Sequence, residues 1–433
     1  MTPIRESLET WFDASPRARR VAVVLFALAG LAAATIAVNK ALTRQLDLYV
    51  ILNASRGLLA GADIYSAPTS NGAYYLYLPL IAFLFIPLAL LPQVVAGVLW
   101  IVLDIVLIAL SLHEALKLIA GDAYWKLTPF ERWTLHLMPV IFCADAISSE
   151  IGNAQVNCLI LAAAILSLKL LHSHRDAPAG AILGIAVVAK VFTAPVLLYE
   201  LLELRFRLIF TAAMAGVAAL LLPAILIGWQ KNIDYISYWA TNIALHGDVV
   251  SNRSGFAGNA SMQAALTRLF TDQPAFILKG VPYSLNIADM DPGTIGMIGM
   301  LGPAFAIVLL LIYFSLYRRH RGLISYWGGI AIAFCIAPLI TPVVERPHFV
   351  MLLPAYVYVC WLWLRERVES NLFYALLIAA FVLSTFTLKL YVGEFWGSVF
   401  WSLGAPTLSD MCLIAAIFVA ASCRDDHDLT PAQ

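Results

Sequence analysis

The sequence predicts an all-α polytopic membrane protein with about twelve transmembrane helices. Of its 433 residues, 61% are apolar and only 12% are charged, whereas soluble domains are about half apolar and about a quarter charged. Apolar runs of roughly 17 to 23 residues recur along the whole chain, and this is the length that a helix needs to cross a bilayer. Arginine clusters beside these runs indicate their orientation.

Twelve apolar runs qualify as transmembrane helices. An even number of crossings places both termini on one side, and the arginine clusters at 17–20, 205–207, 318–321 and 365–367 then all face the cytoplasm. The first run lacks a small-residue cleavage site, so we expect a retained helix and not a signal peptide. The runs cover residues 21–38, 75–91, 95–116, 132–149, 155–171, 178–199, 208–228, 294–316, 323–341, 348–364, 371–388 and 398–422.

Two long segments on the outer side, 39–73 and 229–292, are rich in aromatic and polar residues. In the first of them, Tyr49, Asn53 and Arg56 share one helical face, which favours an interfacial helix along the membrane surface. Residues 145–157 are too polar for contact with lipid. The alternation of sides places them in the cytoplasm, but a re-entrant tip buried in protein fits their sequence equally well.

Charge and motifs argue against several functional classes. The net charge is zero, which suggests no nucleic-acid partner. The six cysteines show no zinc or redox spacing, so we expect neither disulfides nor a metal bound through sulfur. No glycine-rich phosphate loop follows a strand, which argues against a nucleotide-sugar site of the Rossmann type.

Carboxylates in or beside membrane spans are functional candidates because they are costly there. Asp47 lies between Leu46 and Leu48 shortly after the first run. It is placed to act as a general base on a hydroxyl, although a solvated loop aspartate explains it as well. For Asp63, in a turn after Gly61, we expect a structural role, and for Asp104, inside the third run, a partner on another helix.

Three groups are suited to bind a phosphate. Arg346 and His348 lie at the outer mouth of the tenth run, where a guanidinium can grip a phosphate and an imidazole can donate beside it. Anchoring at the interface is the alternative for this pair. Lys190 lies within the sixth run and needs a carboxylate, carbonyls or a phosphate as partner.

Two clusters combine small residues with amides. The first, GNAQVN, contains Asn153 and Gln155, and the second, GNAS, contains Asn259 and Ser261. Such side chains can bind sugar hydroxyls and can equally cap helices.

Several of these segments together resemble glycosyltransferase family 87, the bacterial polyprenyl-phosphate-mannose-dependent enzymes of the C-type superfamily. DLYVILNASRGLLAGADIYSAP followed by YYLYLPLIAFLFIPLALLP resembles the family's opening. GNAQVNCLILAAAIL is similar to its Gly-Gln-x-Asn segment, AGAILGIAVVAKVFTAPVLLYELL to its helix with a lysine, and GNASMQAALTRLF to its Gly-Asn-x-Ser element. ITPVVERPHFVMLLP is similar to its Pro-containing segment that ends in a pair of histidines.

The resemblance implies a C-type glycosyltransferase fold and transfer of a sugar, mannose, from a polyprenyl-phosphate carrier. The acceptor would be a glycolipid or glycan hydroxyl at the periplasmic face of a bacterial inner membrane. Asp47 matches the family's catalytic base and His348 its histidine near the lipid phosphate. We add Arg346 and Lys190 as ligands of the donor phosphate. The residues expected to bind substrate are Asn153, Gln155, Asn259, Ser261 and Tyr49.

The transfer is expected to invert the anomeric centre and to need neither a metal ion nor another cofactor, because a phosphate leaving group stabilises its own charge. We expect one integral membrane domain over 1–433. It comprises a helical module of the catalytic type over 21–228, the second outer loop 229–292 and C-terminal helices over 293–425. The sequence departs from the family where Asn153 replaces the usual glutamine, and around Val344 to Pro347, where a tryptophan and the first histidine are missing.

Two other functions use the same features. A transporter or lipid flippase without covalent chemistry would place Lys190 and Asp104 along a substrate pathway, but no internal repeat supports it. An oligosaccharide polymerase or ligase would use arginines of the outer loops, for which Arg253 and Arg268 are the candidates.

Overall fold

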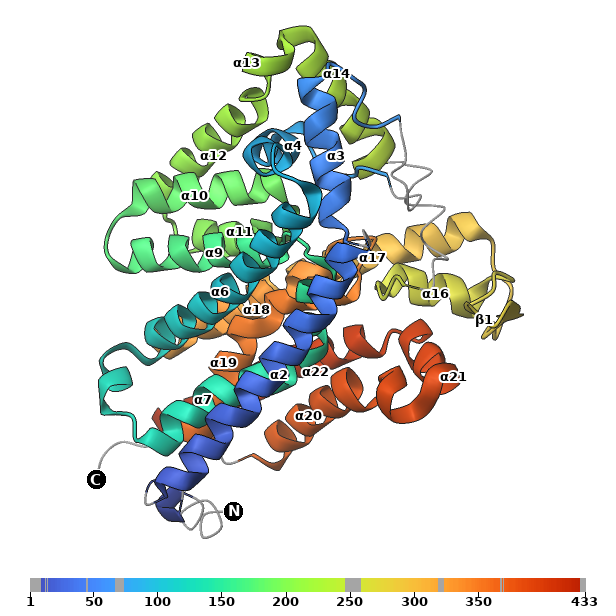
Figure 1. The fold of residues 1–433 in the computed structure, drawn as a ribbon. Helices are drawn as coiled ribbons and strands as arrows, with labels where there is room; N and C mark the ends of the chain where they lie inside the picture. Colours follow the sequence, from blue (N-terminus) through green and yellow to red (C-terminus); the bar gives the residue numbers. More distant parts are fainter. Residues whose placement is uncertain are drawn as a thin grey trace.

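The computed structural model describes residues 9–11, 13, 15–43, 46–66, 74–245, 258–317, 323–366, 368 and 370–428. This part of the chain is helical apart from short connections and one antiparallel hairpin, in which β1 (Phe276–Leu278) pairs with β2 (Val281–Tyr283) (Figure 1). The all-α membrane class is therefore confirmed. Arg318, Arg319, Arg321 and Arg367, used above to assign sides, lie outside the described residues, as does Arg253.

The first half of the chain forms helices that pack closely in sequence order. In Figure 1, α9, α10 and α12 lie beside one another, and α3 packs on α4 and α5. The elements are α2 (Pro16–Leu42), α3 (Leu48–Leu59), α4 (Pro79–Leu84), α5 (Ile86–Ala89), α6 (Gln93–Ala120), η1 (Gly121–Lys126), α7 (Pro129–Phe142), α8 (Ala144–Asn153), α9 (Asn157–His172), α10 (Asp176–Ala189), η2 (Val191–Thr193), α11 (Ala194–Leu202), α12 (Phe206–Leu221), α13 (Ala224–Ile227), α14 (Trp229–Tyr238) and the π-helix η3 (Trp239–Leu245).

The second half adds a helical layer and the hairpin, which lies beside α21. Its helices are α16 (Met262–Phe270), α17 (Pro292–Tyr317), α18 (Leu323–Leu339), the 3-10 helix η4 (Arg346–Leu352), α19 (Leu353–Trp361), the π-helix η5 (Leu362–Glu366), α20 (Asn371–Phe381), the π-helix η6 (Val382–Phe386), α21 (Lys389–Ser402) and α22 (Ala405–Asp428).

Among the described residues, five helices are long and apolar enough to cross a membrane, and two bent helix pairs would raise that number to seven. Other apolar helices are shorter, such as α9 with 16 residues, which reaches only about 24 Å. The predicted count of twelve spans is thus not confirmed. Helix α3 forms where the interfacial helix was expected and buries eight of its twelve residues, while its position at a membrane surface stays a prediction.

Residues 75–91 do not form one continuous helix. Two prolines, Pro79 and Pro87, begin separate helices of six and four residues, because proline cannot donate the backbone hydrogen bond that would continue the preceding turn. Arg56 of α3 donates to the carbonyls of Ala89 at 3.0 Å and Leu91 at 3.4 Å. The end of this run therefore remains beside α3, and the predicted crossing at 75–91 is not confirmed.

Residues 145–157 include the close neighbours of Asp47. The backbone N–H of Asp47 donates to the carbonyl of Asn153 at 2.9 Å, and Lys40 Nζ donates to the Asn153 side-chain oxygen at 2.8 Å. Residues 153–155 therefore lie beside Asp47, so the outer position predicted for Asp47 and the cytoplasmic position predicted for residues 145–157 are incompatible with each other. Helices α7 and α8 meet at an angle of 67°, a bend that fits a broken span and a re-entrant loop equally.

At the opposite end of α7, an ion pair joins two distant parts of the chain. Glu131, in the first turn of α7, accepts from Arg365 Nη1 at 2.7 Å, and Arg365 follows α19 in the π-helix η5. The Glu131 side chain also accepts from the backbone of Thr128, which caps this end of the helix. Helices α7 and α19 pack along each other between this pair and the candidate site.

Candidate functional site

Asp47 lies at the start of α3, with its carboxylate in a defined position. The backbone N–H bond to Asn153 fixes its main chain, and Oδ2 accepts from Gln155 Nε2 at 2.8 Å. The side chain is partly exposed, unlike its neighbours Leu46 and Leu48, which are fully buried. The burial of these leucines anchors the backbone and leaves the carboxylate accessible.

Asp47 faces a cavity of about 510 Å³ that is built from widely separated segments. This volume is within the range of small-molecule sites. Segment 345–347 forms one part of the wall, and residues of the hairpin and of α21 form another. The lining residues are Asp47, Ser149, Asn153, Gly258, Phe276, Ile277, Glu345, Arg346, Pro347, Lys389, Ser398, Trp401 and Ser402.

A chain of hydrogen bonds leads from Asp47 to His348 below this cavity. Gln155, which donates to Asp47, accepts from Asn157 Nδ2 through Oε1 at 3.0 Å. Asn157 Oδ1 in turn accepts from Lys190 Nζ at 2.6 Å, and Lys190 Nζ lies 3.1 Å from His348 Nε2. The structure thus connects Asp47, Lys190 and His348, which the sequence analysis singled out separately.

Lys190 lies at a break between two helices and not inside one. Helix α10 ends at Ala189, Lys190 is extended with φ −158° and ψ 126°, and Pro195 stands in the first turn of α11. Its nitrogen is 4.7 Å from the ring centre of Phe192 and 5.7 Å from that of Tyr77, so two aromatic faces contribute to its environment. The broken helix turns the lysine toward the polar network.

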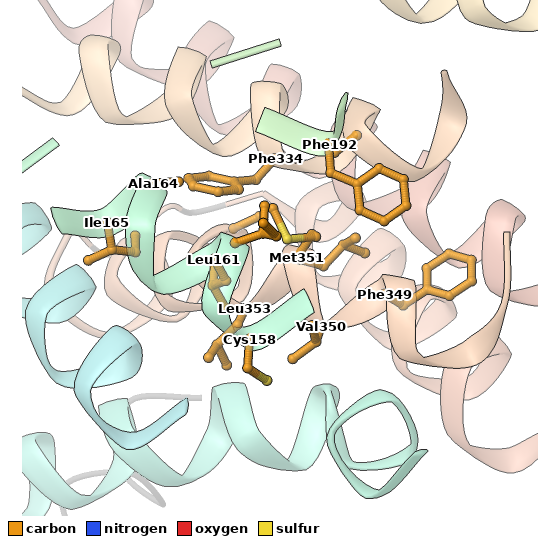
Figure 2. Packing of buried hydrophobic residues seen from close by; sticks show 14 of the residues in the cluster. Cys158, Leu161, Ala164, Ile165, Phe192, Phe334, Phe349, Val350, Met351 and Leu353 are labelled. Carbon is orange, nitrogen blue, oxygen red and sulfur yellow. The ribbon is translucent and has the colours of Figure 1, made fainter. Parts of the chain in front are cut away.

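His348 and Arg346 stand on η4, which the core holds firmly. Figure 2 shows the neighbouring side chains Val350 and Met351 packed among residues of α9 and α18, and both are fully buried. His348 Nδ1 accepts from the backbone N–H of Glu345 at 3.1 Å, which orients the ring so that Nε2 points to Lys190. This orientation depends on packing that is distant in sequence.

Arg346 reaches the cavity between a carboxylate and an aromatic ring. Its Nη1 lies 3.6 Å from Asp145 Oδ1, and its guanidinium carbon is 4.6 Å from the ring centre of Trp401. About a third of the Arg346 side chain is exposed, so the guanidinium is free to meet an anionic ligand in the cavity. Asp145 was not among the residues expected to matter.

Tyr49 is expected to bind substrate, but its hydroxyl contacts other parts of the protein. The hydroxyl donates to the carbonyl of Ala41 at 2.9 Å and packs against Gly97 of α6. The side chain is 4% exposed and does not line the cavity. In this structure Tyr49 joins α2, α3 and α6.

Asn259 and Ser261 are also used by the backbone. The Asn259 side chain donates to the carbonyl of Pro342 at 3.0 Å and accepts from the N–H groups of Ser261 and Val344. Ser261 donates to the same Pro342 carbonyl at 2.8 Å and caps α16 through the N–H of Ala264. Their neighbour Gly258 lines the cavity, and together they hold the segment that leads to Arg346.

Arg268, the outer-loop arginine considered for a polymerase, is fully buried. It donates to the carbonyls of Ser402, at 2.8 Å, and Asn259. Burial lowers the pKa of the Arg268 guanidinium to about 10. Because Ser402 lines the cavity, this cation supports the cavity wall from behind.

Of the other two carboxylates, Asp63 has the structural role expected of it, whereas Asp104 lacks the expected partner on another helix in the part of the chain that the structure describes. Asp63 accepts from the N–H of Tyr65 at 3.0 Å and so closes a turn. Asp104 is fully buried, and within the described residues its oxygens have no hydrogen-bond partner. Its acidic neighbour is Glu150, which the sequence analysis missed; the polar run 145–157 was the signal that pointed to this region.

Comparison of the sequence with known protein families identifies the family of this chain. The sequence model of glycosyltransferase family 87 matches residues 75–288. This match places the chain in glycosyltransferase family 87. The protein is therefore a glycosyltransferase, and its long apolar helices indicate a membrane protein. No curated protein and no solved structure matches the chain.

The matched region includes only part of the candidate site described above. Gln155, Asn157 and Lys190 lie within residues 75–288, whereas Asp47 precedes that region and His348 follows it. The folded chain brings the outlying residues to the matched ones through the contacts described above. The candidate site thus combines residues of the matched region with residues that precede and follow it.

Proposed function

We propose that this protein transfers mannose from a polyprenyl-phosphate carrier to a hydroxyl of a glycolipid or glycan. The observation that carries the proposal is the cavity that Asp47 shares with Arg346, together with the hydrogen-bonded chain from Asp47 to Lys190 and His348. It brings a general base and phosphate-binding groups together, which is what a displacement at an anomeric carbon needs.

In the proposed reaction, Asp47 takes the proton from the acceptor hydroxyl. The acceptor oxygen attacks the anomeric carbon, and the bond between that carbon and the carrier's phosphate oxygen breaks. The bonding electrons leave with the phosphate, whose charge becomes more negative by one, and the proton remains on Asp47. A single displacement inverts the anomeric centre.

Arg346 and the polar groups behind it oppose the charge that develops on the phosphate. Arg346 lines the cavity, whereas Lys190 and the neutral imidazole of His348 lie behind the wall segment 345–347. A fixed cation and hydrogen-bond donors placed where charge develops stabilise a leaving phosphate. The proposed reaction therefore uses protein groups for this purpose and includes no metal ion or other cofactor.

The remaining candidate residues divide into two groups in this proposal. Asn153 and Gln155 adjoin Asp47 and contact the substrate from the base side. Asn259, Ser261 and Tyr49 position the segments that carry Arg346 and Asp47, since their side chains bond to backbone groups. We propose that the cavity opens toward the periplasm of a bacterial inner membrane, where lipid-linked sugars and their acceptors meet.

The test is transfer by the purified protein in lipid, with a radiolabelled polyprenyl-phosphate mannose and candidate acceptor lipids. Asp47→Asn keeps the size of the side chain and removes the base, so turnover should fall roughly 100- to 10,000-fold. Asp63→Asn is the matched control, because Asp63 closes a turn outside the cavity and its asparagine can close the same turn.

Three results would count against the proposal. Undiminished turnover by Asp47→Asn would remove this residue from the mechanism. Transfer from a nucleotide sugar in place of the lipid-linked sugar would refute the donor. Movement of the lipid across vesicles without a new glycosidic bond would instead identify a flippase.

A further inference from the structure

Glu150 lies at a branch of the hydrogen-bonded chain described above. It is fully buried on α8, and its Oε2 accepts from Asn157 Nδ2 at 2.7 Å while Oε1 accepts from the backbone N–H of Cys158 at 3.0 Å. It does not line the cavity. A buried carboxylate is costly unless it is paired and hydrogen-bonded, so its place here requires an explanation.

The amide of Asn157 has only one orientation that satisfies all its neighbours. Its two N–H groups are used by Glu150 and by Gln155 Oε1, and its oxygen accepts from Lys190. A flipped amide would turn its oxygen toward the Glu150 carboxylate and its N–H groups toward the Lys190 nitrogen. The charge of Glu150 therefore selects the observed orientation, since a carboxylate only accepts.

The orientation of Asn157 then determines that of Gln155. Because Asn157 donates to Gln155 Oε1, the Gln155 amide must turn its Nε2 toward Asp47, which it does at 2.8 Å. With the opposite direction, an amide oxygen would face the Asp47 carboxylate. The direction of the hydrogen bonds along the chain thus decides whether an N–H group or an amide oxygen faces Asp47.

We propose that Glu150 is a positioning residue for the transfer: its carboxylate sets the direction of the hydrogen bonds through Asn157 and Gln155, so that an N–H group faces Asp47. This inference rests on the proposed function. It assigns Glu150 a role beneath the site without contact to the substrate.

Asp104 provides a contrast to Glu150 within the same buried region. The ligand atoms of Asp104, Glu150 and Cys158 lie within 4.8 Å of one another, a spacing that a metal ion also favours. Both Glu150 oxygens, however, already accept N–H groups that belong to the chain and to α9, and Asp104 has no bond to Asn157. Glu150, and not Asp104, is therefore the carboxylate that sets the direction of the hydrogen bonds in this chain.

The first experiment compares Glu150→Gln with Asp104→Asn in the transfer assay. Glutamine is close in size but carries its own N–H donors, so Asn157 and Gln155 are free to reverse. We expect kcat to fall about 100-fold, the cost of misplacing a reacting group by about 1 Å, with KM for the donor unchanged. Asp104→Asn and Glu200→Gln, a buried carboxyl that bonds to Tyr326 far along α11, should keep the wild-type kcat.

A double-mutant cycle with Gln155→Ala tests whether the effect passes through Gln155. If it does, adding Glu150→Gln to Gln155→Ala lowers kcat no further. Losses that multiply in the double variant would overturn the inference, and so would a wild-type kcat in Glu150→Gln. If Glu150→Gln does not fold, Asn157→Asp breaks the same chain, and an unchanged kcat in that variant would overturn it equally.

Two controls separate the possible failures. If the wild type transfers sugar and Asp47→Asn does not, the proposed function stands whatever Glu150→Gln shows, and only the positioning role is at stake. If the wild type shows no transfer, the proposed function itself fails. Metal analysis of the purified protein completes the set: one bound zinc per chain that is lost in Asp104→Asn would replace the positioning role with a metal site.

Discussion

Two short amide clusters of similar composition have different partners in this protein. In residues 152–157, the side chains of Gln155 and Asn157 bond to other side chains, among them Asp47 and Lys190. In residues 258–261, the side chains of Asn259 and Ser261 bond to backbone groups around Pro342. The first cluster contributes to the chemistry of the site, whereas the second holds the chain that forms its wall.

The difference comes from what surrounds each cluster. Residues 154–156 connect α8 with α9 beneath the cavity, and there the nearest polar groups are the ionisable side chains. Residues 258–261 enter α16, where Ser261 serves as the N-cap and the nearest partner is an extended backbone segment. A sequence cluster of glycine and amide residues thus indicates that its side chains form hydrogen bonds. It does not indicate whether their partners are ionisable side chains or backbone groups.

The largest expected effect is a loss of transfer activity on substitution in the first cluster, residues 152–157. Gln155→Ala removes the N–H donor to Asp47, so we expect turnover to fall about 100-fold. It also leaves a buried N–H of Asn157 without the Gln155 oxygen, so the melting temperature should fall by a few degrees as well. Transfer kinetics and thermal unfolding in detergent measure the two quantities. Normal kinetics with a lowered melting temperature would give Gln155 the role that we assign to Asn259.

The next effect should distinguish the second cluster by stability. Asn259→Ala leaves the N–H groups of Val344 and Ser261 without the side-chain oxygen that accepts from both in a fully buried place, whereas the Pro342 carbonyl keeps its bond from Ser261. An unsatisfied buried group costs about 1–3 kcal/mol, so the melting temperature should fall by several degrees. A variant that melts like the wild type but binds donor poorly would return Asn259 to the substrate-binding residues.

The smallest effect concerns the cap of α16. Ser261→Ala removes the hydroxyl that accepts from Ala264 and donates to Pro342, and loss of such a cap costs about 1 kcal/mol. Ser261→Thr, which keeps the hydroxyl, is the matched control and should retain most of the stability. If serine and alanine proved equal in thermal unfolding, the cap would contribute nothing here.

The sequence predicted the helical membrane body well because composition and the length of apolar runs depend on the lipid solvent. It was less informative where prolines interrupt a run. Pro79 and Pro87 were visible in the run 75–91, yet its hydropathy alone suggested a crossing. Counting that run as a crossing placed residues 145–157 on the side opposite to Asp47, whereas Asn153 and Gln155 contact Asp47 in the structure.

For the site, the family resemblance pointed to Asp47, Lys190 and His348 one by one, and the structure adds how they connect. The connection depends on Asn157 and Glu150, which come together with Lys190 only after α10 breaks at Ala189. Pro195 was a signal of that break. No periodicity in the sequence could specify the direction of the amides, since this follows from three-dimensional neighbours.

The ion pair between Glu131 and Arg365 joins the ends of α7 and α19 that lie away from Asp47. The other ends lead to α8, which carries Asp145, and to η4, which carries Arg346, and these two residues form a second contact between opposite charges at 3.6 Å. Because α7 has 14 residues and so is about 21 Å long, the two helical segments are joined by charged pairs near both of their ends, one of them at the cavity wall.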